Sequence, residues 1–209
     1  MQPARTRPIL GAILAGGASR RFGSPKAVAE VHGRRIIERV RGVLAEAVDE
    51  MVLITNEPNL FAGIALPVRG DREPGLGPLA GVESALLRAS ERGAGGALCV
   101  SCDMPFLSAA LLREIAARGG EARAVVPESG RGIEPLCAWY PVGARGQVTR
   151  LLASDDRSLR ALLESIETVR MPVDEVRRFG DPEVVFFNVN TPGDLARAER
   201  IARQIDGSY

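Results

Sequence analysis

The sequence predicts an α/β protein built on a mostly parallel sheet. Short apolar runs alternate with stretches whose apolar residues recur at helical spacing, which is the pattern of successive strand–helix units. The chain has 209 residues, of which 45% are hydrophobic and 25% are charged, as in ordinary globular domains. A glycine-rich turn directly follows the first apolar run, at the place where open α/β sheets bind ligands.

Seven apolar runs are predicted strands, because they are short and are bounded by turn residues. They are residues 9–15, 51–55, 65–68, 97–102, 124–127, 135–140 and 184–189. The run 135–140 lies in a less regular part of the chain, and we expect it to be the antiparallel member of the sheet.

Six stretches carry the apolar spacing of helices. They are residues 36–48, 79–92, 109–118, 142–152, 158–165 and 192–204. Ser108 is a suitable cap for the third, and Thr191-Pro192 caps and starts the last, with proline at the first helical position. No linker, repeat or low-complexity tract interrupts the chain, so we expect residues 1–209 to form a single domain.

Composition narrows the classes of function. The net charge is +1, which gives no electrostatic reason to expect nucleic-acid binding. No apolar run approaches the length of a membrane span. The first apolar stretch runs straight into Gly16-Gly17 without a signal-peptide cleavage pattern, so we expect a cytoplasmic protein.

The cysteines offer a second chemistry, a redox dithiol or half a metal site at Cys99 and Cys102. Residues three apart on a strand point to opposite faces, which suits neither role. Zinc would need a further ligand, and the one histidine, His32, lies in a predicted turn. We therefore expect Cys99, Cys102 and Cys137 to be buried free thiols in a reducing compartment.

The glycine-rich loop carries most of the functional information. Gly16 and Gly17 let the backbone approach a ligand, and successive amides that point inward can cradle an anion. Arg20, Arg21 and Lys26 then supply positive charge for a polyphosphate. Of the 27 basic residues, Lys26 is the only lysine, and a compact ammonium suits phosphate contacts. The spacing is that of neither a Walker A motif nor a dinucleotide fingerprint.

This loop resembles a known signature. The segment from Leu14 to Lys26 reads Leu-Ala-Gly-Gly-Ala-Ser-Arg-Arg-Phe-Gly-Ser-Pro-Lys. It resembles the signature of the molybdenum cofactor guanylyltransferase (MobA) family of nucleotidyltransferases, whose related cytidylyl and sugar-phosphate enzymes carry variants. The resemblance implies a Rossmann-like three-layer α/β/α sandwich of the nucleotide-diphospho-sugar transferase type, with one antiparallel strand. Ala15-Gly16-Gly17 looks more like the guanylyl branch than the molybdopterin cytidylyl branch.

The resemblance also implies roles for individual residues. Leu14, Ala15, Gly16, Gly17 and Lys26 would bind the nucleotide, and Arg20 and Lys26 would act in catalysis together with Asp103. The string Ser-Cys-Asp-Met-Pro-Phe-Leu around Asp103 resembles the family's metal-binding motif. Asp103 follows a predicted buried strand, so a turn or cap residue is the structural alternative. A nucleotidyl transfer needs a divalent cation held by one or two carboxylates, so Asp103 is the expected Mg²⁺ ligand.

Other residues and segments resemble the family less specifically. Asp71, before the Gly77-Pro-Leu-Ala-Gly81 string, is similar to its nucleotide-contacting aspartate, and Asn56 is a candidate contact to the base or ribose. Asn188 or Asn190 could complete the metal shell, although capping of the last helix explains Asn190 equally well. The segment from Glu134 to Tyr140 looks like the family's acceptor-side segment.

The function that this resemblance implies is transfer of GMP from Mg·GTP to the phosphate of molybdenum-molybdopterin, with release of pyrophosphate. It also implies molybdoenzymes or other cofactor-assembly proteins as partners. The nearest alternatives are the same chemistry with CTP or with another phosphorylated acceptor. A GTP-binding switch without turnover and a redox or metal carrier at Cys99 and Cys102 are alternatives from other classes.

Overall fold

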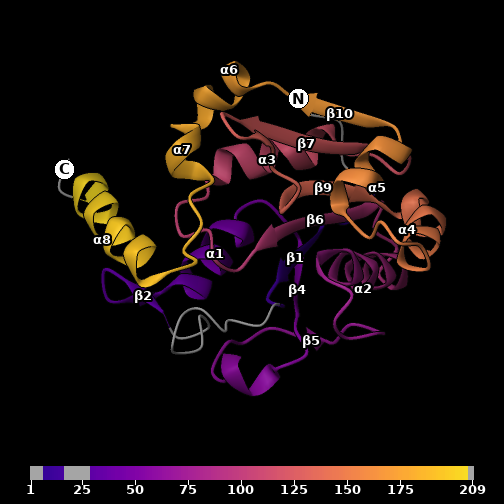
Figure 1. Ribbon diagram of the computed structural model, residues 1–209, viewed down its shortest axis with the longest axis horizontal. Coiled ribbons are helices and arrows are strands. Elements are labelled where there is room, and N and C mark those ends of the chain that lie inside the picture. Colours follow the sequence, from indigo (N-terminus) through magenta and orange to yellow (C-terminus); the bar gives the residue numbers. More distant parts are fainter. Residues whose placement is uncertain (1–6, 17–28, 207–209) are drawn as a thin grey trace.

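The computed structural model describes residues 7–16 and 29–206, and it is built around one eight-stranded sheet (Figure 1). The strands of that sheet are β1 (Leu10–Leu14), β4 (Glu50–Ile54), β5 (Val68–Arg69), β6 (Gly96–Ser101), β7 (Ala124–Ser129), β8 (Gly132–Ile133), β9 (Cys137–Pro141) and β10 (Thr168–Met171). Their order is β10-β7-β9-β6-β1-β4-β5, with β8 paired to β7. A separate two-stranded ribbon joins β2 (Glu30–Val31) to β3 (Arg34–Arg35).

The sheet is mostly parallel, as the sequence predicts. β1 pairs in parallel with β4 and β6, and β5 and β10 are parallel to their neighbours β4 and β7. β9 is antiparallel to both β6 and β7, which confirms the expected orientation of the run 135–140. Because β9 alone reverses direction among the long strands of this sheet, its first residue lies beside the last residues of β6.

Helices cover both faces of the sheet and complete three layers (Figure 1). On one face α1 (Ile36–Ala45) and α3 (Ala109–Arg118) pack in a core that includes Ile13 of β1. On the other face α2 (Pro78–Glu91), α4 (Arg145–Leu152) and α5 (Leu159–Ser165) pack in a core that includes Leu10 and Leu14. The two cores receive alternate residues of β1, since successive side chains of a strand point to opposite faces.

The C-terminal part departs from one prediction. Residues 184–189 do not form a strand: α7 (Pro182–Val185) occupies the start of this run and irregular chain follows it. Asp181 Oδ1 accepts a hydrogen bond from the amide of Glu183, and Pro182 stands at the first helical position, so the local signals favour a helix. A short buried apolar run does not by itself distinguish strand from helix. The long final helix α8 (Pro192–Asp206) follows as predicted.

The remaining differences concern short elements. Within the predicted run 65–68 only Val68 belongs to a strand, β5. The ribbon β2–β3, the two-residue β8 and the edge strand β10 have no counterpart among the predicted strands. Among the predicted helices, α6 (Val173–Val176) and the 3-10 segments Pro58–Phe61 and Arg177–Phe179 have no counterpart, whereas the 3-10 turn Val142–Ala144 is the start of the predicted stretch 142–152. No helix within residues 7–16 and 29–206 has both the length and the apolar character needed to cross a bilayer.

The ends of the strands define two opposite edges of the sheet. The C-terminal ends of β1, β4, β5, β6, β7 and β10 meet at one edge, which we call the carboxyl edge, and β9 begins there. The opposite edge, where β1 and β6 begin, is called the amino edge. In open α/β sheets ligands bind outside the carboxyl ends of the strands.

Candidate functional site

β1 lies between β4 and β6, and its last residues lead into the glycine-rich loop. The amide of Cys102, just beyond β6, donates to the carbonyl of Leu14 at 3.1 Å, and the amide of Ala15 donates to the carbonyl of Ile54 at 2.8 Å. Leu14 and Ala15 are buried, whereas Gly16 is exposed. The chain therefore emerges at Gly16 between the ends of β4 and β6. Gly17, Arg20, Arg21 and Lys26 lie outside the described residues, so the phosphate cradle stays a prediction.

Asp103 lies two residues beyond β6, next to the exit of β1. The buried Ser101 hydroxyl donates to Asp103 Oδ1 at 2.6 Å, and the amide of Val189 donates to the Asp103 carbonyl at 3.0 Å. The carboxylate is half-buried, and its backbone and side chain are both fixed. The cap of α3 is Ser108, whose Oγ accepts from the amide of Leu111, so capping does not explain Asp103.

A divalent cation is compatible with this arrangement. Within the described ranges no group of three or more histidine, cysteine, aspartate or glutamate side chains could by itself hold a metal ion. Mg²⁺ in nucleotide sites is commonly held by one or two carboxylates together with substrate phosphates and water. A single oriented carboxylate beside the start of the glycine-rich loop is compatible with that requirement, and Asp103 has this position.

Asn56 and Asp71 form a reciprocal pair at the ends of β4 and β5. Asn56 Nδ2 donates to Asp71 Oδ2 at 2.9 Å, and the amide of Asp71 donates to Asn56 Oδ1 at 2.8 Å. Asp71 Oδ1 is buried and has no hydrogen-bond partner within residues 7–16 and 29–206. Burial raises the pKa of the Asp71 carboxyl above its ordinary value, and the hydrogen bond from Asn56 offsets part of that rise.

The start of α2 closes this side of the site. Gly77 precedes the helix with φ of +76°, a conformation that favours glycine, and Pro78 occupies the first helical position. A Cβ at Gly81 would lie 3.4 Å from the Leu14 side chain and 3.9 Å from Asp71 Oδ1. The first turns of α2 therefore face the residues that the sequence predicts to contact the nucleotide.

The segment after α7 runs along the carboxyl edge. Arg131 Nη2 donates to the carbonyl of Phe186 at 2.9 Å and to Glu134 Oε1 at 3.2 Å. The buried Glu134 carboxylate also accepts from the Ser129 hydroxyl at 2.6 Å. With Val189 bonded to the Asp103 carbonyl, this segment connects the expected acceptor side to the expected metal ligand.

The residues that cap α8 differ from one expectation. Asp194 Oδ2 accepts from the amides of Asn190 and Thr191, and the Thr191 hydroxyl accepts from the amide of Asp194. This reciprocal capping box makes Thr191 the cap, as predicted, and Asn190 precedes it without ending a strand. Asn188 Nδ2 donates to the carbonyl of Phe186 at 3.3 Å. A metal role for Asn190 stays a prediction, and capping by its side chain no longer explains it.

Several residues of the site were missed by sequence reasoning. Ser101 and Ser129 hold carboxylates, Arg131 joins β8 to the last irregular segment, and Asp194 completes the α8 cap. Only Asp194 had a readable signal, since Thr191-x-x-Asp194 is a capping pattern. The two hydroxyl donors precede their carboxylates by only two and five residues, but neither spacing is a recognised motif.

The cysteines lie apart from this chemistry. Cys99 and Cys137 are fully buried, and burial raises the pKa of both thiols far above the ordinary value. Cys99 contributes to one core, whereas the half-buried Cys102 packs against the other. None of the three forms a disulfide, and the opposite orientation predicted for Cys99 and Cys102 is confirmed, but the expected burial is wrong for Cys102, which lies at the margin of its core.

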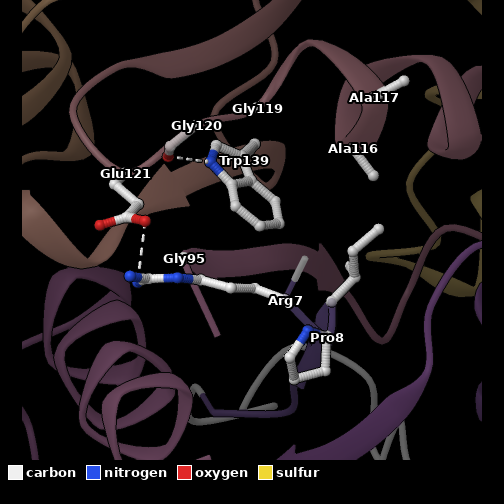
Figure 2. A pocket seen from close by; sticks show the side chains of 10 residues that line it. Arg7, Pro8, Gly95, Ala116, Ala117, Gly119, Gly120, Glu121 and Trp139 are labelled. Carbon is white, nitrogen blue, oxygen red and sulfur yellow. Dashed lines mark hydrogen bonds and ion pairs between the residues drawn. The ribbon is translucent and has the colours of Figure 1, made fainter. Parts of the chain in front are cut away.

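A hollow of about 280 Å³ lies at the amino edge (Figure 2), where Ile9 and Gly95 in its lining directly precede β1 and β6. Its wall consists largely of small residues around Trp139, whose Nε1 donates to the carbonyl of Gly120 at 2.9 Å. Arg7 and Glu121 at its rim form an exposed ion pair at 2.8 Å. The polar groups here bind one another.

Comparison with known proteins gives a consistent picture. The family described as the MobA-like NTP transferase domain matches residues 11–170. A molybdenum cofactor guanylyltransferase of Rhodobacter capsulatus is 38% identical over 94% of this chain and 97% of its own. Another, of Xanthomonas euvesicatoria, is 36% identical over 91% of this chain and 94% of its own.

Solved structures agree on the architecture. The crystal structure of molybdopterin-guanine dinucleotide biosynthesis protein A from Archaeoglobus fulgidus has a TM-score of 0.78 and 28% identity, covering 93% of this chain and 99% of the other. A manganese complex of Rv0371C from Mycobacterium tuberculosis has a TM-score of 0.67 and 20% identity, over 92% of this chain and 98% of the other. The second likeness concerns the fold alone.

Proposed function

The chain belongs to the MobA-like NTP transferase family, and from this premise we propose that it is a molybdenum cofactor guanylyltransferase. It transfers GMP from Mg·GTP to the phosphate of molybdenum-molybdopterin and releases pyrophosphate. The observation that carries the proposal is the bond between the Cys102 amide and the Leu14 carbonyl, because it sets Asp103 beside the start of the glycine-rich loop.

Residues at the end of β1, in the glycine-rich loop and beyond β5 are proposed to bind the nucleotide. Leu14, Ala15, Gly16 and Gly17 lead into the loop whose amides and Lys26 hold the phosphates, and Asp71 faces the nucleoside part. The assignment is supported by the position of Gly81 in α2, whose Cβ position lies near both the Leu14 side chain and Asp71 Oδ1. Arg20 and Lys26 neutralise the charge that develops on the phosphates during transfer.

Asp103 is the proposed Mg²⁺ ligand, and Asn190 is the second candidate. When bound, Mg²⁺ would supply positive charge to the phosphates and to the leaving pyrophosphate. The chain's own contribution is orientation: Ser101 holds Oδ1 of Asp103, and Val189 holds its carbonyl. An oriented carboxylate reduces the reorganisation needed when the nucleotide and its cation arrive.

The acceptor side requires no activated side-chain nucleophile. A phosphate monoester is already ionised at neutral pH, so its oxygen can attack the α-phosphorus of GTP in line, and the bond from that phosphorus to pyrophosphate breaks. The chain has to place the two phosphates in contact and exclude water. Glu134 and the segment 186–190 lie on the same edge as Asp103, which supports their place beside the acceptor.

The proposal includes its setting. It takes residues 1–209 as one domain acting in the cytoplasm, with molybdoenzymes or other cofactor-assembly proteins as recipients of the product. The guanylyl branch is favoured over the cytidylyl branch by Ala15-Gly16-Gly17 and by the names of the relatives.

The experiment is a side-by-side transfer assay. Either α-labelled GTP or α-labelled CTP is added to purified protein, Mg²⁺ and molybdenum-molybdopterin. The labelled dinucleotide and, separately, the released pyrophosphate are then measured. We expect both products with GTP and neither with CTP. Transfer from CTP alone would identify a cytidylyltransferase, and GTP binding without pyrophosphate would identify a nucleotide-binding protein that does not catalyse transfer.

A further inference from the structure

We propose that Asn56 is a positioning residue, which acts on the nucleotide through Asp71 and not by a contact of its own. The inference rests on the proposed function, since it assumes that Asp71 faces the bound nucleotide. It replaces the direct contact to base or ribose that the sequence suggests for Asn56.

The geometry of the pair is the first argument. Both polar atoms of the Asn56 amide bind Asp71, with Nδ2 to the carboxylate and Oδ1 to the backbone amide. A Cβ at Gly70 would lie 3.1 Å from Asn56 Oδ1, so the backbone before Asp71 also closes on this amide. Asn56 is thus directed at the 70–71 backbone and the Asp71 side chain, both of which follow a different strand.

The residues around Asp71 are held independently of Asn56. The Ser84 hydroxyl donates to the carbonyl of Gly70 at 3.1 Å, and Arg72 lies 3.6 Å from Glu83 in an ion pair. Both partners belong to α2, and the Glu83 side chain is 12% exposed. The helix therefore holds the Gly70 carbonyl and the Arg72 side chain, one on each side of Asp71, whereas Asn56 holds the Asp71 amide and orients its carboxylate.

This arrangement leaves Asp71 Oδ1 oriented to accept a hydrogen bond from the nucleotide. With Oδ2 bound by Asn56, the other oxygen, Oδ1, is buried and lacks a partner in the described part of the chain. Leaving such an oxygen without a donor is costly, and a donor from the nucleotide would remove that cost. Rotation of the carboxylate about its χ2 bond would lose this arrangement, and the Asn56 amide opposes that rotation.

The test is a double-mutant cycle on nucleotide affinity. The Kd for Mg·GTP is measured by calorimetry for wild type, Asn56→Ala, Asp71→Ala and the double variant. We expect Asn56→Ala to weaken binding about tenfold and to cause less than a twofold further loss when Asp71 is already alanine. Asn59→Ala, an exposed asparagine three positions further on, is the matched control and should bind as wild type does.

Each outcome has a distinct meaning. Losses that multiply in the double variant would show that Asn56 binds the nucleotide itself or supports the loop generally, and they would overturn the inference alone. Absence of GTP binding by the wild-type protein would contradict the proposed function, and the inference with it. Thermal unfolding midpoints within about 2 °C of wild type ensure that folded proteins are compared.

An exchanged pair gives a second readout. In Asn56→Asp/Asp71→Asn the amide and the carboxylate trade places, so the hydrogen bond between the side chains is retained. We expect wild-type thermal stability but the same weakened GTP affinity as Asp71→Asn. Wild-type affinity in the exchanged protein would show that the carboxylate need not be at position 71, which contradicts a positioning role for Asn56.

Discussion

The two edges of the sheet use polar residues in different ways. At the carboxyl edge Asp71 and Asp103 each accept a hydrogen bond from a neutral side chain, Asn56 and Ser101 respectively, whereas Glu134 accepts from both the Ser129 hydroxyl and the Arg131 guanidinium. At the amino edge the charges of Arg7 and Glu121 are paired with each other on the surface (Figure 2). A neutral donor orients a carboxylate without cancelling its charge, and Asn56 and Ser101 act in this way on Asp71 and Asp103.

The hollow at the amino edge has a packing origin. A Cβ at Gly96 would lie 2.5 Å from the Trp139 ring, and a Cβ at Gly119 would lie equally close to it. The indole therefore requires glycine on both sides, and the small residues leave open space at the surface. Concavity alone does not indicate function here, whereas the orientation of carboxylates does.

The largest loss of activity is expected from substitution of Lys26. Lys26→Ala should lower turnover by about 10³-fold or more, because its ammonium neutralises charge that develops on the transferring phosphates. Pyrophosphate release under saturating Mg·GTP is the measurement, with circular dichroism to verify folding. Wild-type turnover in this variant would remove Lys26 from the site.

At the amino edge the expected effect is on stability. Gly119→Ala places a methyl group 2.5 Å from the Trp139 ring and should lower the free energy of unfolding by about 1–3 kcal/mol. Gly120→Ala is the matched control, since nothing lies within 4 Å of its Cβ position. Chemical denaturation measures both variants. Reduced GTP affinity in folded Gly119→Ala would show that the two edges are not independent.

At the carboxyl edge Asp71→Asn should weaken GTP binding about tenfold while raising stability slightly. Burial raises the pKa of Asp71 in the folded chain, so the folded state binds its proton more tightly than the unfolded state does. The stability of wild type therefore falls as pH rises through the interval from the unfolded pKa to the raised folded pKa, and asparagine avoids this loss.

Thermal unfolding of the two unliganded proteins checks the sign. We expect Asp71→Asn to melt about 1–2 °C higher at pH 7, with the difference disappearing at acid pH, where Asp71 is protonated in both states. A lower melting temperature at pH 7 would mean that the ionised Asp71 carboxylate stabilises the fold.

The smallest effect is expected at the exposed ion pair. Arg7→Ala should change the free energy of unfolding by less than about 0.5 kcal/mol and leave the KM for GTP unchanged, since surface pairs contribute little. Denaturation in parallel with the transfer assay measures both quantities. A change in KM would indicate that the amino edge communicates with the nucleotide site.

The sequence predicts the strands of this sheet better than it predicts the side-chain contacts at the carboxyl edge. The apolar runs that contain β1, β4 and β6 are predicted strands, because they alternate with stretches whose apolar residues have helical spacing. Asp103 was found because it follows one of those runs directly. The pairing of Asn56 with Asp71 was not, because it depends on how β4 and β5 align, and a two-residue strand such as β5 leaves almost no pattern.

The run 184–189 shows the converse limitation. Its buried residues suggest a strand, but Asp181 and Pro182 start a helix, and the chain that follows uses its amides to bind Asp103 and the α8 cap. Apolar character indicates burial, whereas the choice between strand and irregular chain depends on distant hydrogen-bond partners.

The most direct test of the account is transfer of label from α-labelled GTP to molybdenum-molybdopterin by wild type and by Asp103→Asn across a Mg²⁺ titration. The substitution keeps the size of the side chain and removes its charge. We predict Mg²⁺-dependent transfer by wild type and a loss of about 10³-fold in the folded variant. Transfer by Asp103→Asn at the wild-type rate and with the same Mg²⁺ dependence would contradict the account.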